Sequence, residues 1–253
     1  MLSTITQSFS ALRLLLHIML GILLILCTGA IWNNKTKLVK STKQWWLSRI
    51  TRLMGIKVNV VGSIPSPYPG KGILYVSNHV SWIDIPLIGG LQQINFLSKA
   101  EVKNWPLIGY LAQSTGTLFI KRGNGDAQKV AEDIAGYIEQ GRSVLFFPEG
   151  TTSDGRQVRR FFPKLFRAAE HTQIQLCPVA VHYKLEDNPS NPAAFIDDDE
   201  FGSHLWNLLR YRNIQATVEF LPVRPLPSTN LSETVKQAQQ EISQSVARMH
   251  GSG

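Results

Sequence analysis

The chain of 253 residues carries 26 Lys and Arg against 18 Asp and Glu, which gives a net charge of +8 at neutral pH. The hydrophobic content of 43% excludes a disordered chain, two cysteines exclude a disulfide scaffold, and 19 glycines without a period exclude collagen-like sequence. The length suits one large domain or two small ones, and the excess of positive charge favours an anionic partner.

An apolar run of sequence LLLHIMLGILLILCTGAIW spans Leu14–Trp32. As a helix it is about 28 Å long, close to the thickness of the hydrocarbon core of a bilayer. A cleaved signal peptide is the alternative, but the run is long for one and its basic residues follow it, with only Arg13 before. We predict a retained anchor in the inner (plasma) membrane, with the main body on the cytoplasmic side.

A second segment, Leu38–Met54, places tryptophans and aliphatic residues at roughly helical spacing among Lys and Arg. This pattern predicts a basic amphipathic helix at the membrane interface, and an ordinary helix packed on the domain fits it equally well. We therefore divide the chain into an anchoring segment, 1–55, and a catalytic domain, 56–253.

From Ile56 onward, short β-branched runs alternate with helical stretches. This alternation predicts an α/β fold with a mixed, mostly parallel central sheet flanked by helices. The predicted strands are Lys57–Val61, Ile73–Ser77, Asn95–Ser98, Thr117–Ile120, Ser143–Phe147, Leu176–His182 and Gln215–Phe220. The predicted helices are Ile85–Leu91, Leu107–Thr115, Ala127–Gln140, Phe162–Glu170, His204–Arg210 and Ser232–Met249.

A histidine and an aspartate, His79 and Asp84, follow the second predicted strand. Five residues on a helix turn through about 500°, so the two side chains meet only if the chain bends between them. The strand end at Ser77 and a helix start near Ser81 supply such a bend, and Asp84 would then orient His79 as a general base. The alternative is structural, because Ser81-x-x-Asp84 also fits a capping box and a lone histidine is often a hydrogen-bonded loop residue.

The sequence contains no Gly-x-Ser-x-Gly elbow, no His-Glu-x-x-His, no Walker loop and no Gly-x-Gly-x-x-Gly. A base without a protein nucleophile indicates direct attack by a hydroxyl of the substrate. The basic residues lack the interleaved aromatic residues of a stacking platform, so we expect no nucleic-acid partner.

Four ordered blocks give the chain a resemblance to a known family. They are Asn78-His79-x4-Asp84, Phe119-Ile120-Lys121-Arg122, Phe147-Pro148-Glu149-Gly150-Thr151 and Cys177-Pro178-Val179-Ala180-Val181. In this order the blocks resemble those of the glycerolipid (PlsC-like) acyltransferase family, which includes the bacterial 1-acyl-sn-glycerol-3-phosphate acyltransferases.

The resemblance implies a mechanism and a set of residues. His79, oriented by Asp84, would deprotonate the sn-2 hydroxyl of 1-acyl-sn-glycerol-3-phosphate, which attacks the thioester of acyl-CoA or acyl-carrier protein to give phosphatidic acid. Membrane lipids, the lysophospholipid acceptor and the acyl donor are then the partners, and no metal or other cofactor is expected. The substrate-binding residues implied are Asn78, Ser81, Trp82, Lys121, Arg122, Glu149, Gly150 and Thr151.

Two features of the sequence keep other acceptors open. Many members that form phosphatidic acid carry Arg where this chain has Thr152, and Arg supplies bidentate phosphate recognition. The segment 195–206 resembles a subgroup that includes lyso-ornithine lipid acyltransferases. A lyso-ornithine lipid or another lyso-aminolipid is the alternative acceptor, and a non-catalytic membrane-bound module that binds an anionic ligand is the alternative of another class.

Overall fold

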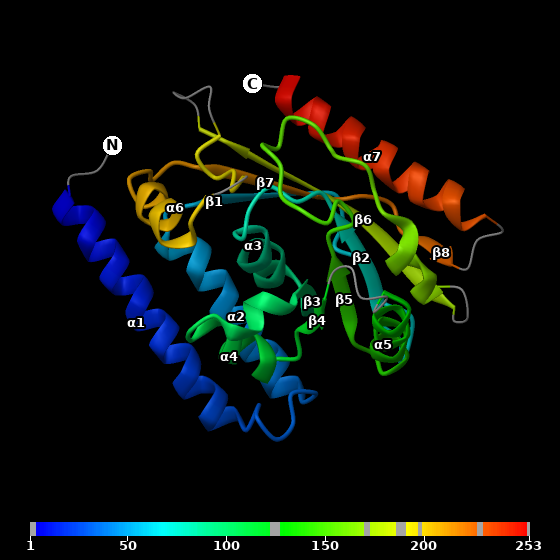
Figure 1. The fold of residues 1–253 in the computed structure, drawn as a ribbon, viewed down its shortest axis with the longest axis horizontal. Helices are drawn as coiled ribbons and strands as arrows, with labels where there is room; N and C mark the ends of the chain where they lie inside the picture. Colours follow the sequence, from blue (N-terminus) through cyan, green and yellow to red (C-terminus); the bar gives the residue numbers. More distant parts are fainter. Residues whose placement is uncertain are drawn as a thin grey trace.

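One sheet of eight strands organises the computed structural model, which describes residues 4–121, 127–169, 173–185, 191–196, 199–226 and 230–251 (Figure 1). The strands are β1 (Lys57–Val61), β2 (Ile73–Ser77), β3 (Ile94–Lys99), β4 (Leu118–Ile120), β5 (Ser143–Phe146), β6 (Ile174–Lys184), β7 (Gln215–Phe220) and β8 (Arg224–Leu226). Their order is β1-β7-β6-β2-β5-β3-β4, with β8 paired to β6. Five of the strand pairs are parallel, and β6 runs antiparallel to β7 and β8, so the predicted mixed, mostly parallel sheet is confirmed.

Helices cover both faces of this sheet and lie on its opposite sides in Figure 1. The helices are α1 (Thr4–Thr28), α2 (Lys37–Leu53), α3 (Asp84–Leu91), α4 (Ile108–Ser114), α5 (Ala127–Glu139), α6 (Phe201–Leu208) and α7 (Leu231–Gly251), with 3₁₀ helices η1 (Ala100–Asn104) and η2 (Pro163–Ala169). Side chains of β2 alternate between two cores: Ile73 and Tyr75 pack toward α2 and α3, and Leu74 and Val76 pack toward α5 and α7. A strand buried on both faces explains the continuously apolar sequence of β2.

The first helix packs along the domain by one narrow face. Gln7 donates a hydrogen bond to the carbonyl of Trp206, and Arg212 donates one to the hydroxyl of Ser10. Further along, His17 Nε2 donates to the carbonyl of Trp46 at 2.9 Å, and the Trp46 indole donates back to the carbonyl of His17 at 2.8 Å. The first two contacts fix the start of α1 to α6 and to the segment that follows α6, and the last two fix α1 to α2.

The opposite face of α1 is exposed and apolar. Within the described residues α1 is the helix long and apolar enough to cross a membrane. It begins at Thr4, ten residues before the start of the predicted run, and ends at Thr28, four residues before the end of that run. The exposed apolar stripe consists of Ile5, Phe9, Leu12, Leu16, Met19, Leu23 and Leu26.

Several predicted elements differ from the structure. The predicted α-helix Phe162–Glu170 is wrong over its described residues, because Pro163–Ala169 forms a 3₁₀ helix. Its buried Phe166 and Ala169 lie three residues apart, the spacing at which side chains align on a 3₁₀ helix. Two short elements, η1 and β8, were not predicted, and β8 contains Pro225, a residue that argues against a strand from sequence alone.

Candidate active site

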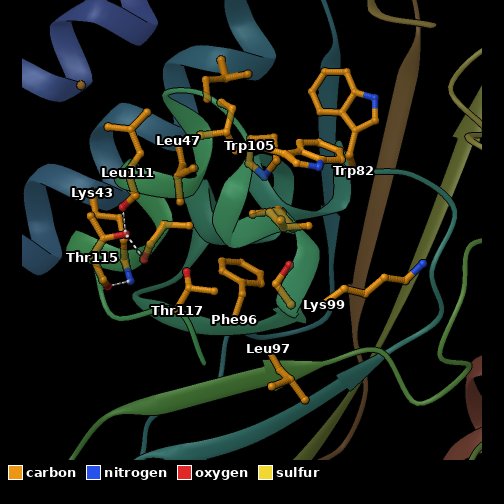
Figure 2. A pocket seen from close by; sticks show the side chains of 18 of the residues that line it. Lys43, Leu47, Trp82, Phe96, Leu97, Lys99, Trp105, Leu111, Thr115 and Thr117 are labelled. Carbon is orange, nitrogen blue, oxygen red and sulfur yellow. Dashed lines mark hydrogen bonds between the residues drawn. The ribbon is translucent and has the colours of Figure 1, made fainter. Parts of the chain in front are cut away.

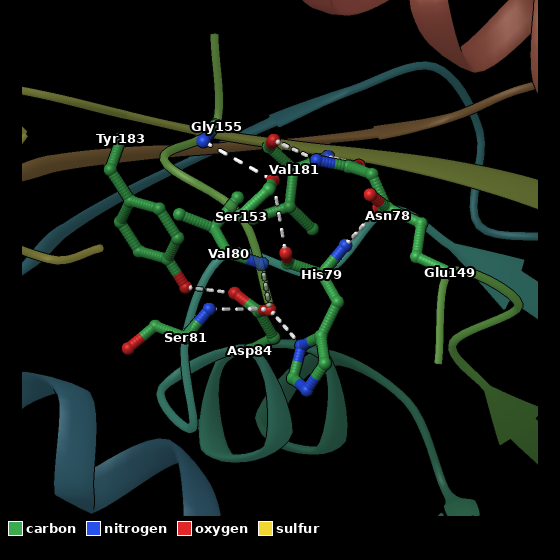
Figure 3. A network of polar contacts seen from close by, with 10 residues as sticks. All are labelled: Asn78, His79, Val80, Ser81, Asp84, Glu149, Ser153, Gly155, Val181 and Tyr183. Carbon is green, nitrogen blue, oxygen red and sulfur yellow. Dashed lines mark hydrogen bonds and ion pairs between the residues drawn. The ribbon is translucent and has the colours of Figure 1, made fainter. Parts of the chain in front are cut away.

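The bend between β2 and α3 brings His79 and Asp84 together. β2 ends at Ser77 and α3 begins at Asp84, and across this turn His79 Nδ1 lies 2.7 Å from Asp84 Oδ2 (Figure 3). Because a carboxylate only accepts hydrogen bonds, Nδ1 carries the proton and Nε2 keeps its lone pair. Nε2 makes no hydrogen bond with the described residues, and the ring stacks on Phe147 with centroids 3.8 Å apart.

The carboxylate of Asp84 is fully buried and accepts four hydrogen bonds. Oδ2 accepts from His79 and from the backbone N–H groups of Val80 and Ser81, at 2.9 and 3.0 Å. Oδ1 accepts from the Tyr183 hydroxyl at 2.7 Å (Figure 3). Buried charge is costly unless it is paired and hydrogen-bonded, so this set of donors makes the buried carboxylate tolerable.

Tyr183 is a residue that the sequence did not single out. It lies on β6, 99 positions after Asp84, and its side chain is buried. Burial, and next the nearby Asp84 carboxylate, raises the pKa of Tyr183 well above its usual value, so the phenol remains a donor at any physiological pH. It acts on the histidine through Asp84 and is therefore a positioning residue.

The capping box predicted for Ser81 and Asp84 is half formed. The backbone N–H of Ser81 donates to the Asp84 carboxylate, but Ser81 Oγ is buried without a hydrogen-bond partner among the described residues. The same carboxylate thus starts the helix and orients His79, so the two interpretations of Asp84 are compatible.

Glu149 supports the backbone of the site. Its side chain is buried, with Oε1 accepting the backbone N–H of His79 at 2.7 Å and Oε2 that of Arg159 at 2.8 Å. Burial raises the pKa of Glu149 from 4.5 to about 7, against the lowering effect of these two hydrogen bonds. We expected Glu149 to position the acceptor directly; the observed contacts position His79.

An apolar cavity of about 460 Å³ opens beside His79. Figure 2 shows Trp82 and Trp105 at one side of it and Lys43 with Thr115 at the other. Aliphatic side chains of α1, α2 and α4 line much of its wall, including Leu14, Leu47 and Leu111. Its size falls in the range of about 300–1,000 Å³ that is usual for ligand pockets.

The far side of this cavity is closed by polar contacts. Lys43 Nζ donates to the carbonyls of Ile94 and Thr115, at 2.9 and 3.3 Å, and to the side chain of Asn95. Burial lowers the pKa of Lys43 to about 7, with a smaller contribution from Arg142. These bonds tie α2 to β3 and to the end of α4.

Three other predicted substrate-binding residues, Trp82, Gly150 and Thr151, line the cavity together with His79. The Trp82 indole donates to His204 Nδ1 at 3.1 Å. Asn78, also expected to bind substrate, is buried and exchanges two hydrogen bonds with the backbone of Val181, which joins β2 to β6.

The structure describes only the first of the two basic residues in the second sequence block. Lys121 is exposed at the end of β4 and is not among the residues that line the cavity. Arg122 lies outside the described residues. Lys99 of β3, which the sequence did not assign to substrate binding, lines the cavity.

The geometry combines a carboxylate-oriented imidazole, a free ring nitrogen and an adjoining apolar cavity. This combination suits proton removal from a hydroxyl on a molecule with an apolar chain. The Acyltransferase family model matches residues 57–182, a region that contains His79, Asp84 and Glu149. The chain belongs to the PlsC-like acyltransferase family and is a lipid acyltransferase.

Relatives and one solved structure refine this assignment. The chain is 41% identical over 209 residues to lyso-ornithine lipid O-acyltransferase of Pseudomonas aeruginosa. These aligned residues make up 82% of this chain and 79% of the relative. It is 30% identical over 160 residues to 1-acyl-sn-glycerol-3-phosphate acyltransferase of Neisseria gonorrhoeae, covering 63% of each. The crystal structure of the 1-acyl-sn-glycerophosphate acyltransferase of Thermotoga maritima shares the fold, with a TM-score of 0.67, 18% identity, and coverage of 95% and 98%.

Tyr183→Phe removes one donor from the buried Asp84 carboxylate. A hydrogen bond to a charged group is worth about 1.5–3 kcal/mol, so we expect kcat for acyl transfer to fall roughly 10- to 100-fold. KM should change little, because Tyr183 does not line the cavity.

Tyr75→Phe is the matched control for this variant. Tyr75 is also a buried tyrosine, and its hydroxyl accepts from Gln92 without contacting Asp84. Steady-state kinetics of both variants from pH 5 to 9 make the comparison. Equal kinetics for Tyr183→Phe and Tyr75→Phe would contradict the positioning role.

The raised pKa of Glu149 predicts a pH dependence of stability. The folded chain binds this proton more tightly than the unfolded chain, so raising the pH favours unfolding between about 4.5 and about 7. The unfolding free energy of the wild type, relative to Glu149→Gln, should therefore fall across this window and level off above it. Denaturant titrations of both proteins at each pH test this, and parallel curves would show that Glu149 titrates normally.

Proposed function

We propose that this protein transfers a fatty acyl group from acyl-CoA or acyl-carrier protein to the free hydroxyl of a lyso-ornithine lipid. The observation that carries this proposal is the 41% identity, over most of both chains, to a protein named for that reaction. The side chains that line the cavity near His79 support the same acceptor.

The reaction requires one base and no covalent enzyme intermediate. His79 Nε2 takes the proton of the acceptor hydroxyl while Asp84 holds the opposite ring nitrogen. The hydroxyl oxygen forms a bond to the thioester carbonyl carbon, the carbon–sulfur bond breaks, and the proton passes from the imidazolium to the departing thiolate. The products are an ester and a free thiol, and the apolar cavity holds the acyl chain beside the base.

The residues that line the cavity near His79 support an ornithine head group over a phosphate. The position that Arg occupies in many phosphatidic-acid-forming members is Thr152 here, and it lines the cavity. The rings of Trp82 and Trp105 both lie near Phe201, with centroids 5.0 and 5.3 Å from it. Aromatic rings attract ammonium groups, and ornithine carries an ammonium and a carboxylate instead of a phosphate.

Acylation of 1-acyl-sn-glycerol-3-phosphate to phosphatidic acid is the second candidate. It is the reaction that the resemblance of the four sequence blocks implies. The Neisseria relative named for that reaction supports it, as does the presence of Lys99 in the cavity wall. The higher identity and coverage of the lyso-ornithine lipid acyltransferase favour the alternative.

We place the protein at the inner (plasma) membrane, with its catalytic domain on the cytoplasmic side. The exposed apolar stripe of α1 and the exposed Trp32 support contact with lipid. Because the other face of α1 packs on the domain, this helix lies against the catalytic body along much of its length. The basic residues that follow the apolar run support the cytoplasmic orientation.

The two acceptors can be compared directly in one assay. With equal amounts of lyso-ornithine lipid and 1-acyl-sn-glycerol-3-phosphate and one acyl thioester, we expect acylated ornithine lipid as the major product by mass spectrometry. His79→Ala should lower the rate about 10²–10⁴-fold, the usual contribution of a general base. Phosphatidic acid as the major product would select the second candidate, and thiol release without either acceptor would contradict direct transfer.

Thr152→Arg places a guanidinium in the head-group end of the cavity. Because a charge-assisted hydrogen bond to phosphate is worth about 1.5–3 kcal/mol, we expect kcat/KM for 1-acyl-sn-glycerol-3-phosphate to rise at least about tenfold relative to lyso-ornithine lipid. Thr152→Met is the control for added bulk without charge. An identical acceptor ratio in the two variants would show that residue 152 does not face the head group.

A further inference from the structure

A second hollow lies between α1 and α2. It is distinct from the apolar cavity beside His79, which we call the acyl cavity because it would hold the acyl chain in the proposed reaction. It has a volume of about 380 Å³ and is lined by Arg13, Arg49 and Arg52 together with His17 and three leucines. The acyl cavity is lined from α1 by other residues, among them Leu14, Gly21 and Ile25. The two helices are therefore a shared wall, with His79 on one side and the arginines on the other. We call the hollow the arginine groove.

The arginine groove concentrates positive charge without a protein counter-charge. Arg49 and Arg52 are three residues apart on α2, and Arg13 faces them from α1. None of the three forms an ion pair with a carboxylate of the described residues. Like charges gathered in one groove repel each other, so an anion bound between them would be stabilised.

The sequence shows that this charge is confined to the N-terminal part. The first acidic residue of the chain is Asp84, and nine Lys and Arg precede it. The remaining 170 residues carry 17 basic and 18 acidic side chains, so the whole positive excess belongs to the segment that contains α1 and α2. An anion that binds the protein electrostatically is drawn to this segment.

Apolar surface adjoins the groove on α1. Leu16 belongs both to the groove and to the exposed apolar stripe, and Leu20 and Leu53 complete the apolar lining. Trp45, 44% exposed, lies beside the groove with its ring 5.3 Å from the Arg49 guanidinium. Tryptophan next to basic residues at the edge of an apolar surface is typical of the lipid head-group region.

We propose that the arginine groove binds the phosphodiester of an anionic membrane phospholipid, whose acyl chains lie against the leucines and the apolar stripe. Guanidinium groups hold phosphate oxygens by paired hydrogen bonds, which lysine does not provide. A free phosphate ion would leave the apolar part of the groove without a partner. The bound lipid fixes α1 to α2 and so stabilises the wall that separates it from the acyl cavity.

Lipid binding to the full chain in detergent tests the proposal without any turnover. By native mass spectrometry we expect one molecule of phosphatidylglycerol to remain bound, and little phosphatidylcholine at the same concentration. Arg49→Gln with Arg52→Gln should lower phosphatidylglycerol occupancy at least about tenfold. Lys35→Gln with Lys37→Gln removes the same charge from exposed positions outside the groove and should leave occupancy near the wild-type value.

Three outcomes would overturn the proposal. They are equal binding of both lipids, an equal loss in the two double variants, and displacement of phosphatidylglycerol by equimolar inorganic phosphate. Thermal unfolding followed by circular dichroism confirms that both double variants are folded before occupancy is compared. Because the measurement requires no acyl transfer, an error in the proposed acceptor would not alter it.

Discussion

The buried carboxylate of Asp84 is the constraint on which the site depends. It accepts hydrogen bonds from the backbone of its own turn, from His79 and from Tyr183 on β6. An isolated buried charge would be expelled or neutralised, so the turn, the imidazole and the tyrosine have to be present together. Glu149 acts in a similar way on the other side of His79, by accepting its backbone N–H. His79 is thus held by its ring and by its main chain, from the ends of β2 and β5.

The apolar cavity beside His79, the exposed apolar stripe and the arginine groove are all built on the same two helices, α1 and α2. One face of α1 and α2 lines the acyl cavity, and the outward parts of the same helices carry the apolar stripe and the arginine groove. The contact between them is close: a Cβ added to Gly21 would lie 2.8 Å from the Trp46 indole, which is itself held by hydrogen bonding to His17. A displacement of these helices from their outer side would therefore reach the wall of the cavity.

The sequence predicted the features that depend on local order. The strand end at Ser77 and a helix start near Ser81 follow from short-range patterns, and the bend that they supply allows His79 to meet Asp84, as it does in the structure. Tyr183 could not be found in this way, because its role arises from the pairing of β2 with β6 about a hundred residues later. The same holds for Glu149, whose motif suggested contact with substrate although its oxygens accept from the main-chain N–H groups of Arg159, ten residues on, and of His79, 70 residues earlier. The packing of α1 was equally hidden, because the partners of its buried polar side chains, Gln7, Ser10 and His17, lie far along the chain.

The position of β6 in the chain has a consequence for biosynthesis. β2, which leads into the histidine, pairs with β5 and β6, so its neighbours are translated 70 to 100 residues after it. Pairings of such long sequence separation form late in folding, because loop closure has to precede them. A nascent chain that ends before β6 already contains the imidazole and the carboxylate but lacks the phenol that anchors them. The complete set of hydrogen-bond donors to Asp84 is therefore assembled only after β6 has been synthesised, long after the N-terminal helices.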